Sequence, residues 1–297
     1  MKKRWMQIGI SLTLSLLGPW AQAWAIEDPS SDSFLIGQVS QELADYLKSA
    51  PVKKRHIYTL EPHKGNHMLI LHQIAGDPSV IAGQDQELHF QFSIKKNLIS
   101  GPYFPLYFAF SQRSWWQVFD GPSSRPFREN NYNPEFFLYW EGRWIFDDIL
   151  IGLWEHQSNG ETTRFDETGT AVNFSRSWDR SYLQAKWSSP NGRWWTEPKV
   201  WNIWDSGKES LADNPDIHDY HGPGQLRAGY YETGLRIEGF WRYGVKGGLT
   251  SQLDLKWSHR CFSEGVLIHA YLFNGYGESL IDYNRHLTKI GLGFSLE

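Results

Sequence analysis

The stretch ELHFQFSIK, residues 87–95, decides the fold because its apolar and polar side chains alternate at every position. In an extended chain, Leu88, Phe90, Phe92 and Ile94 would lie on one face and the polar side chains between them on the other. Alternation of this kind is typical of a β-strand that separates an apolar environment from a polar one. The stretch therefore predicts a strand with two chemically different faces.

The same pattern recurs from about residue 66 to the end of the chain, for example in PLYFAFSQ (105–112) and LTKIGLGFSL (287–296). The strand-like pieces have roughly the ten-residue length of a tilted membrane-barrel strand, and bacterial barrels have an even number of strands. Tight-turn signals separate several pieces, at residues 141–143, 190–192 and 232–234. We therefore predict an all-β fold, a transmembrane antiparallel β-barrel of about twelve strands over residues 63–297.

The composition favours a membrane barrel over a soluble β-protein. Aromatic residues make up 16% of the 297 residues and include 16 tryptophans, yet mean hydropathy is −0.50 and no long apolar run follows the N-terminus. A soluble β-sandwich could supply similar strands, but it would not as readily place Trp and Tyr at strand ends, where membrane interfaces need them. No repeat is sharp enough to indicate a propeller.

Charge and cysteine content exclude other classes. The net charge of −4 and the lack of a basic stripe argue against a nucleic-acid partner. Cys261 is the only cysteine, so no intrachain disulfide is possible.

The N-terminus has the three parts of a secretory signal peptide. A basic start, Met1–Arg4, precedes a short apolar stretch at residues 8–17, and two overlapping Ala-x-Ala cleavage signals follow at residues 21–25. The apolar part is too short to cross a bilayer as a helix. We predict a signal peptide over residues 1–25 and a mature protein in the bacterial outer membrane.

Residues 26–62 form an extension of a different kind. Apolar side chains recur at helical spacing between Leu35 and Leu47, and Pro51 closes the stretch. We expect a partly helical segment, either docked on the barrel or free as an arm. Longer polar segments at residues 120–132, 159–176 and 205–224 are expected to be loops on the outside of the cell.

The segment WEHQSNGETT, residues 154–163, contains candidate catalytic residues. His156 and Ser158 would share one face of a strand about 6–7 Å apart, so the imidazole could act as general base for the hydroxyl. If His156 opposes Asp179 on the next strand, that carboxylate could orient the imidazole. Gly160 lets the backbone turn and present an N–H to an oxyanion.

The position of these residues indicates the outer rim of the barrel. Trp154 shares the face of His156, which suggests the lipid side, beside the loop 159–176. The alternative is that His156 and Ser158 are ordinary polar residues beside a turn, because short motifs match freely. The two interpretations stay open on spacing alone.

Together with further motifs, the sequence resembles the outer membrane phospholipase A family. The resemblance is carried by SQRSWWQ (111–117), RPFRENNYNPEFF (125–137), HQSNG (156–160), RSWDR (176–180), DNPDI (213–217) and NGYGESLIDYN (274–284). It covers most of the chain from about residue 66, whereas residues 26–62 match poorly.

The resemblance implies a twelve-stranded barrel and a calcium-dependent hydrolase of phospholipid acyl esters, with A1, A2 and lysophospholipase activity. It implies that the active form is a homodimer with its sites on the lipid-facing exterior, at the dimer interface. Ser158 would then be the nucleophile, His156 the base, and the Gly160 N–H part of the oxyanion hole.

The same resemblance implies the calcium ligands and one interface residue. Calcium would be held by the hydroxyl of Ser175, the carbonyl of Glu161 and the carbonyl of Ser124 of the partner subunit. Gln112 matches a glutamine that bonds across the dimer interface.

The sequence departs from the family pattern at three places. The third catalytic residue is usually an asparagine, whereas here it is Asp179, whose carboxylate would also stabilise an imidazolium. The loop between Gly160 and Ser175 is longer and adds Asp166 and Glu167, either as extra calcium ligands or as solvated charges. The chain ends in Glu297 instead of an aromatic residue, with Phe294 the nearest.

Two other functions compete with the phospholipase. A catalytically idle barrel could serve as a porin or as a structural outer-membrane protein. An omptin-like outer-membrane protease would need paired acidic residues at the barrel mouth, and the sequence does not place such a pair there.

Overall fold

The computed structural model describes residues 59–297 except 82, 102, 144, 166–168 and 205–210. The predicted signal peptide and residues 26–58 of the predicted extension lie outside the described residues, as do Asp166 and Glu167. Within the described part no helix is both long enough and apolar enough to cross a membrane.

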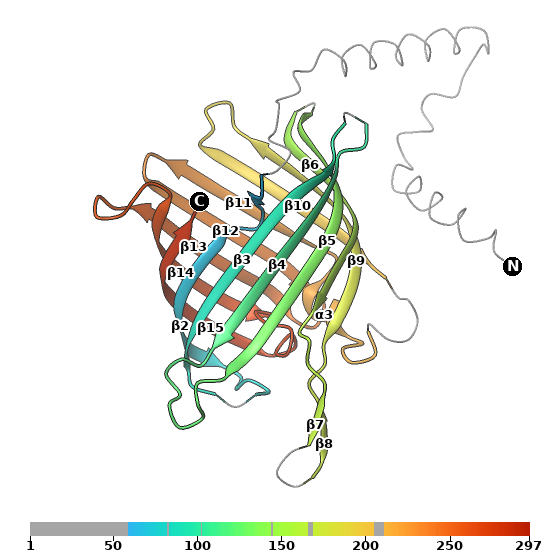
Figure 1. Cartoon of the computed structure of the whole chain (residues 1–297), viewed down its shortest axis with the longest axis vertical. Coiled ribbons are helices and arrows are strands. Elements are labelled where there is room, and N and C mark those ends of the chain that lie inside the picture. The colour runs from blue at the N-terminus through green and yellow to red at the C-terminus, as the bar shows by residue number, and fades with distance from the viewer. Residues whose placement is uncertain (1–58, 82, 102, 144, 166–168, 205–210) are drawn as a thin grey trace, which may run out of the picture. The chain divides into compact units, whose positions relative to one another are not determined.

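Twelve long antiparallel strands form one closed sheet, as the alternating pattern predicts (Figure 1). Each strand pairs with its neighbours in the chain, and the ring closes where β2 pairs with β15. The strands are β2 (Asn66–Gly76), β3 (Gln86–Ile99), β4 (Leu106–Trp116), β5 (Phe127–Arg143), β6 (Phe146–Ser158), β9 (Ser177–Ser188), β10 (Trp194–Ile203), β11 (Gly224–Glu232), β12 (Leu235–Gly244), β13 (Gly248–Ser258), β14 (Val266–Tyr276) and β15 (His286–Leu296).

The short strand β1 (Glu61–Pro62) extends the sheet at its beginning. It pairs with β3 through Glu61 and Lys95, further along the same edge of β3 that β2 occupies. The sheet therefore starts two residues before the expected boundary at residue 63.

The two ends of the barrel differ in the length of their connections. One end carries the long loops 77–85, 117–126, 159–176 and 204–223, whereas turns at the other end are as short as 144–145 and 233–234. Membrane barrels of bacteria place long loops outside the cell, so we refer to these as the loop end and the turn end.

The loops differ in detail from the expectation. The first polar segment was predicted to be a loop over residues 120–132, but β5 already begins at Phe127 because this stretch pairs with β4. The predicted turn at 141–143 lies inside β5 for the same reason, with β6 as its partner. In the loop 159–176, β7 (Thr163–Phe165) and β8 (Ala171–Asn173) form a hairpin that projects from the loop end (Figure 1).

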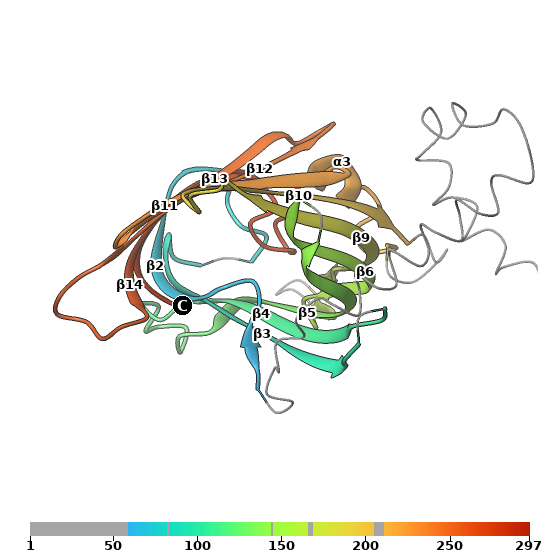
Figure 2. The same ribbon diagram turned by 90° about the horizontal axis from the view of Figure 1, so that it is seen from above.

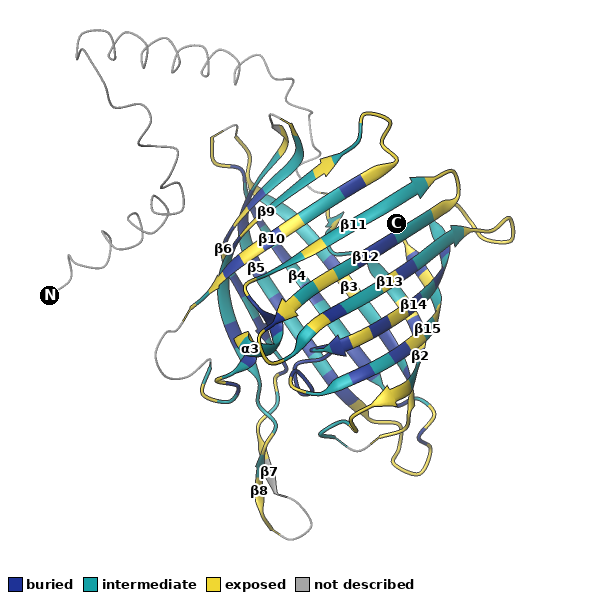
Figure 3. Ribbon diagram, turned by 180° about the vertical axis from the view of Figure 1, so that it is seen from behind, coloured by how far each residue is buried: buried dark blue, intermediate teal, exposed yellow. Residues whose placement is uncertain are grey.

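The strands separate an apolar outer face from a polar inner face. On β3, Phe92 is 50% exposed, whereas Glu87, His89 and Ser93 are buried in the lumen. Figure 3 shows the same alternation of buried and exposed positions along β14, β15 and β2. Apolar side chains favour lipid, while the enclosed polar ones need partners that only the lumen can supply.

Ion pairs and an inward loop occupy the lumen near the loop end. Glu87 accepts hydrogen bonds from Arg128 at 2.8 Å and from Lys289 at 2.5 Å, and Arg128 also reaches Asp282 at 2.7 Å. The loop 277–285 carries Asp282 inward and buries its own Leu280.

The short helix α3 (Ile217–His221) covers an apolar cluster at the loop end, and its place beside β10 and β12 can be followed in Figure 2. Ile217 is fully buried in that cluster, and His221 meets the ring of Trp178 at a centroid distance of 5.1 Å. The cluster supports the inner side of β6 and β9, whose outer side carries the candidate catalytic residues.

Candidate active site

A β-bulge in β6 sets the direction of the candidate catalytic side chains. Ile151 and Leu153 face outward, each 40% exposed, so strict alternation would turn residues 156 and 158 inward. The pairing of β6 with both β5 and β9 shifts between Gly152 and Glu155, which adds one residue to β6. Glu155 consequently faces the lumen, and His156 and Ser158 face outward.

The strand register places a histidine and a carboxylate side by side, as assumed from the sequence. His156 opposes Asp179, and Ser158 opposes Ser177. The imidazole Nδ1 lies 2.9 Å from Asp179 Oδ1, and the indole N–H of Trp154 donates to the same oxygen at 2.9 Å. Because Nδ1 is engaged by the carboxylate, Nε2 is the nitrogen left to act on a hydroxyl.

The pair lies on the outer wall and is accessible. Asp179 shares its face of β9 with Leu183 and Trp187, which are 50% and 39% exposed. The His156 side chain retains 27% exposure, and the Trp154 ring stacks on it at 5.8 Å. A lipid ester at the outer rim of the barrel could therefore reach the imidazole without entering the lumen.

Ser158 occupies the last position of β6, between Tyr132 on β5 and Ser177 on β9. Its hydroxyl makes no hydrogen bond to His156 among the described contacts. Hydrogen bonds of this kind often tighten only when substrate is bound, so the arrangement is compatible with a nucleophile and its base.

Gly160 provides a backbone N–H close to Ser158. Its φ of 66° lies in the left-handed region, and a Cβ at this position would lie 3.2 Å from the Tyr132 ring. Its N–H donates to no acceptor within the described part of the chain. A left-handed backbone close to the serine and an N–H without an acceptor are what a donor to an oxyanion beside Ser158 would need.

Asn159 fixes the backbone around this glycine, a role that sequence reasoning missed. Its buried side-chain oxygen accepts from the N–H groups of Glu161 at 3.2 Å and Arg176 at 2.9 Å. Its amide nitrogen donates to the Phe174 carbonyl at 2.8 Å. Asn-Gly is also a common turn sequence, so nothing local in the sequence distinguishes this role of Asn159 from an ordinary turn.

The predicted calcium ligands Glu161 and Ser175 lie in the neck of the loop 159–176. One hydrogen bond, from Asn159 N to Arg176 O at 3.1 Å, closes the neck on the β6 side. Another, from Phe174 N to Thr162 O at 3.4 Å, closes it on the side of β7 and β8. The extra length of the loop therefore lies beyond the neck, and both residues remain next to Gly160.

The neck suits a hard cation through its oxygen donors. A backbone carbonyl and a serine hydroxyl are ligands that calcium accepts, with waters and further carbonyls completing its shell. No group of three or more His, Cys, Asp or Glu side chains among the described residues is placed to hold a metal. The oxygen donors of the neck, a backbone carbonyl and a serine hydroxyl, are ligands of the kind that calcium accepts, whereas zinc prefers Cys and His side chains.

Two residues of the loop 204–223 hold β9 and the neck in place. Asn214 is fully buried, accepts from the Ser177 N–H at 2.9 Å and donates to the Ser177 carbonyl at 3.0 Å. Asp213 accepts from Asn173 at 2.6 Å, and Asn173 accepts in turn from the Ser175 N–H at 2.9 Å. The DNPDI motif carried family resemblance, but the sequence indicated no such contact.

The remaining predicted residues lie elsewhere, Ser124 in a loop at the loop end and Gln112 on the outer face of β4. Ser124 is exposed in the loop 117–126 with a left-handed φ of 61°. Gln112 pairs across the sheet with Tyr132, which pairs with Ser158, so Gln112 and Ser158 belong to one row of the outer wall. The structure thus places His156, Ser158, Asp179, Gly160, Glu161 and Ser175 in adjoining segments, namely β6, β9 and the neck of the loop between them, and places Ser124 and Gln112 outside these segments.

The chain matches a known protein family over most of its length. The family model Phospholipase A1 matches residues 43–296. Phospholipase A1 of Escherichia coli K12 is 34% identical over 80% of this chain and 82% of its own length, and the Klebsiella pneumoniae enzyme is also 34% identical over the same shares.

Solved structures show the same barrel. Outer membrane phospholipase A from Escherichia coli superimposes with a TM-score of 0.68 at 32% identity, covering 81% of this chain and 99% of that one. The Salmonella typhi outer membrane phospholipase, solved as a dimer with bound calcium, gives a TM-score of 0.68 at 30% identity, covering 86% and 96%. The chain therefore belongs to the phospholipase A1 family of hydrolases, whose solved members are β-barrels of the outer membrane.

Proposed function

We propose that the protein hydrolyses acyl ester bonds of phospholipids, with A1, A2 and lysophospholipase activity, at the outer-wall site and as a calcium-dependent homodimer. Ser158 is the nucleophile, His156 the general base, Asp179 the group that orients it, and Gly160 an oxyanion donor. The observation that carries the proposal is the His156–Asp179 pair at 2.9 Å beside an outward-facing serine.

The reaction begins when His156 Nε2 takes the proton of the Ser158 hydroxyl as its oxygen attacks the ester carbonyl carbon. The carbonyl oxygen becomes an oxyanion, and the free N–H of Gly160 donates to it. His156 then gives its proton to the departing lipid alcohol, which leaves an acyl-enzyme. Water, deprotonated by His156, releases the fatty acid and restores the serine.

Asp179 acts through His156. A carboxylate on Nδ1 selects the tautomer that leaves Nε2 able to accept a proton, and it stabilises the imidazolium between the two proton transfers. Trp154, which donates to the same carboxylate oxygen at 2.9 Å, limits the rotation of Asp179. The family's usual asparagine would share the orienting role but not the charge.

Calcium would be held by the Ser175 hydroxyl, the Glu161 carbonyl and the carbonyl of Ser124 of the partner subunit. When bound it would supply positive charge near the oxyanion. The calcium-bound dimer of the Salmonella typhi relative supports this part of the proposal. Because one ligand comes from the partner, association would complete the site and monomers would be idle, with Gln112 bonding across the interface.

The decisive experiment measures fatty acid release from phospholipid in mixed micelles, with calcium and with a chelator, while the oligomeric state is followed by cross-linking. We expect release only from the calcium-loaded dimer, and none from Ser158→Ala although that variant folds and dimerises. If the calcium-loaded, dimeric wild type released no fatty acid, the protein would be an idle barrel instead.

A porin function finds no support in the lumen. The loop 277–285, with Leu280 and Asp282 buried, occupies part of the lumen at the loop end, where a channel would need open space.

A further inference from the structure

The middle of the lumen contains more cations than carboxylates. Glu155 is fully buried and forms ion pairs with three cations, Arg180 at 2.6 Å, Lys64 at 2.8 Å and Lys199 at 2.9 Å. Lys64 also forms an ion pair with a second carboxylate, that of Glu135, at 2.7 Å. Even with both carboxylates the group keeps a positive charge.

Arg113 of β4 and Arg242 of β12 add to this charge, because no described carboxylate lies within ion-pair distance of either. Among the described residues, Arg242 donates only to the carbonyls of Tyr276 at 2.6 Å and Gly277 at 2.9 Å, and its Nε is buried with no acceptor there. The guanidinium of Arg113 lies over the Trp115 ring at 5.3 Å. A guanidinium cannot shed its proton, so both charges persist at any physiological pH.

Arg113, Arg180 and Arg242 converge on one cavity of about 190 Å³, reached from three different strands. The wall also includes Lys64, Lys199 and Glu278. Glu278 uses one carboxylate oxygen on Lys289 at 2.6 Å, whereas its Oε1 is buried and has no partner. The cavity thus offers an excess of forked donors and one unused acceptor.

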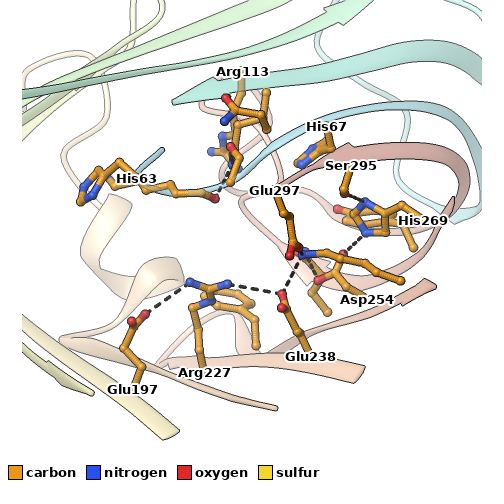
Figure 4. A pocket seen from close by; sticks show the side chains of 18 of the residues that line it. His63, His67, Arg113, Glu197, Arg227, Glu238, Asp254, His269, Ser295 and Glu297 are labelled. Carbon is orange, nitrogen blue, oxygen red and sulfur yellow. Dashed lines mark hydrogen bonds and ion pairs between the residues drawn. The ribbon is translucent and has the colours of Figure 1, made fainter. Parts of the chain in front are cut away.

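This cavity communicates with the turn end of the barrel. It shares Arg113, Lys199 and Glu278 with a neighbouring cavity of about 280 Å³, whose wall extends to Leu296 and Glu297 (Figure 4). The other arginine of that neighbouring cavity, Arg227, is neutralised, because it lies between Glu197 at 3.3 Å and Glu238 at 3.7 Å. The contrast shows that unpaired arginines are not a general property of this lumen.

Arg113, Arg180 and Arg242 are half-buried. Like charges held together in an enclosed lumen repel, and an anion bound between them would relieve that repulsion. Guanidinium groups bind phosphate oxygens bidentately, which makes an oxyanion the ligand they fit best. The free Glu278 oxygen can accept only from a protonated ligand. Hydrogen phosphate has the required O–H, whereas sulfate has none at neutral pH.

We propose that the lumen cavity bounded by Arg113, Arg180 and Arg242 binds a protonated tetrahedral oxyanion of the inorganic phosphate class, which enters from the turn end. Arg113 and Arg242 hold the charge of the anion, and Glu278 accepts its proton-bearing oxygen. The site lies inside the barrel and is separate from the ester-cleaving site on the outer wall.

The test titrates inorganic phosphate into the full-length protein, folded in a neutral detergent without calcium, and follows binding by calorimetry. We expect saturable binding of one phosphate and weaker binding of sulfate. Arg113→Gln and Arg242→Gln should each weaken phosphate binding by about tenfold or more, the effect of losing a charged hydrogen bond. Arg227→Gln, the matched lumen arginine with two carboxylate partners, should bind phosphate like the wild type. Glu278→Gln should reduce the preference for phosphate over sulfate.

Several results would overturn the proposal. They are the absence of saturable binding to the folded wild type, wild-type affinity in Arg113→Gln and Arg242→Gln, or equal affinity for sulfate. Binding of a short-chain phosphatidic acid without binding of inorganic phosphate would assign the anion preference to a lipid headgroup. If a glutamine variant does not fold, Arg113→Lys and Arg242→Lys replace it, because lysine keeps the charge but lacks the paired N–H donors of a guanidinium. Wild-type phosphate affinity in both lysine variants would refute bidentate binding.

Discussion

Two histidine–carboxylate pairs in the described part of the barrel lie beside a serine and can be compared, one on the outer wall and one in the lumen. On the outer wall, His156 contacts Asp179 at 2.9 Å, next to Ser158. In the lumen, His269 contacts Asp254 at 2.7 Å and Ser295 at 2.7 Å, so the inner trio is the more tightly hydrogen-bonded of the two (Figure 4).

The inner trio lacks what a catalytic site needs besides hydrogen bonds. Ser295 is 2% exposed and is the last residue but one of β15. Leu296 after it still pairs with both β14 and β2, and the Glu297 N–H donates to the Gly265 carbonyl at 3.0 Å, so the backbone donors that follow this serine are already used. Ser158 ends its strand, and Gly160 follows with a free N–H. The comparison teaches that the position of a serine in its strand decides its chemistry, because only a strand end leaves backbone donors for an oxyanion.

The largest difference between the two trios is expected when the serine hydroxyl of each is removed. Ser158→Ala should lower kcat for phospholipid hydrolysis by about 10⁴-fold or more, because the nucleophile is lost. Ser295→Ala should leave kcat within about twofold of the wild type, because acyl transfer does not involve it. Both are measured as fatty acid release in calcium-containing micelles. A large loss of activity in folded Ser295→Ala would contradict our assignment.

Removing the carboxylates separates catalysis from stability. Asp179→Ala should lower kcat by about 10²-fold, because His156 loses the group that selects its tautomer. Asp254→Ala should instead reduce the free energy of unfolding by about 1–3 kcal/mol, because His269 and Gln252 lose a buried acceptor. Denaturant titration and the hydrolysis assay, applied to both variants, check the two results. Equal activity losses would show that the lumen pair also contributes to the reaction.

Gly160→Ala probes the backbone donor that the inner trio lacks. An alanine at φ 66° is strained and its Cβ meets Tyr132 at 3.2 Å, so the N–H should move away from Ser158. We expect kcat to fall by about 10²-fold, the effect of one oxyanion donor. Gly192→Ala is the control, because its φ is 67° but nothing lies within 4 Å of the added Cβ. Similar kinetics in both variants would remove Gly160 from the oxyanion hole.

Asn214→Ala tests whether the loop 204–223 positions the outer site. Its side chain holds both backbone groups of Ser177, the strand partner of Ser158, so its loss should shift the neck of the loop 159–176. We expect kcat to be about tenfold lower, and we expect calcium to raise the activity less than it does in the wild type. Asn191→Ala is the matched control, because Asn191 lies in an exposed turn at the turn end of the barrel. This variant should keep the kcat and the calcium dependence of the wild type. Unchanged calcium titration in Asn214→Ala would show that the contact is only structural.

The smallest effect, a change in Tm, is expected at Asp216. This carboxylate lies in the loop 204–223 and belongs to neither trio. A hydrogen bond from Tyr283 at 2.5 Å, helped by Lys246, lowers the pKa of Asp216. A lowered pKa stabilises the fold above the ordinary carboxylate range, and this contribution is lost as pH falls through the lowered pKa. Asp216→Asn should therefore melt slightly below the wild type at pH 7, and the difference in Tm should shrink in acid. A difference in Tm that grows in acid would reverse the sign we assign.

Much of the outer site could be predicted from the sequence. The spacing of His156 and Ser158 places them on one face. The opposition of His156 and Asp179 is a register that sequence reasoning could only assume, and the structure has that register. The face itself was indicated only through Trp154. The bulge between Gly152 and Glu155 that turns these residues outward has no sequence signature, because it depends on pairing with two neighbouring strands at once.

The sequence by itself determined the strands, their approximate number and the apolar outer face, because alternation along an extended chain is a local property. Tertiary structure alone decided the direction of His156, the clamps formed by Asn159 and Asn214, and the cation excess around Glu155. Each of these depends on side chains that are distant in the chain and meet only when the barrel closes. Local patterns specify which face a residue prefers, whereas partners across the lumen or between loops are specified by the closed sheet.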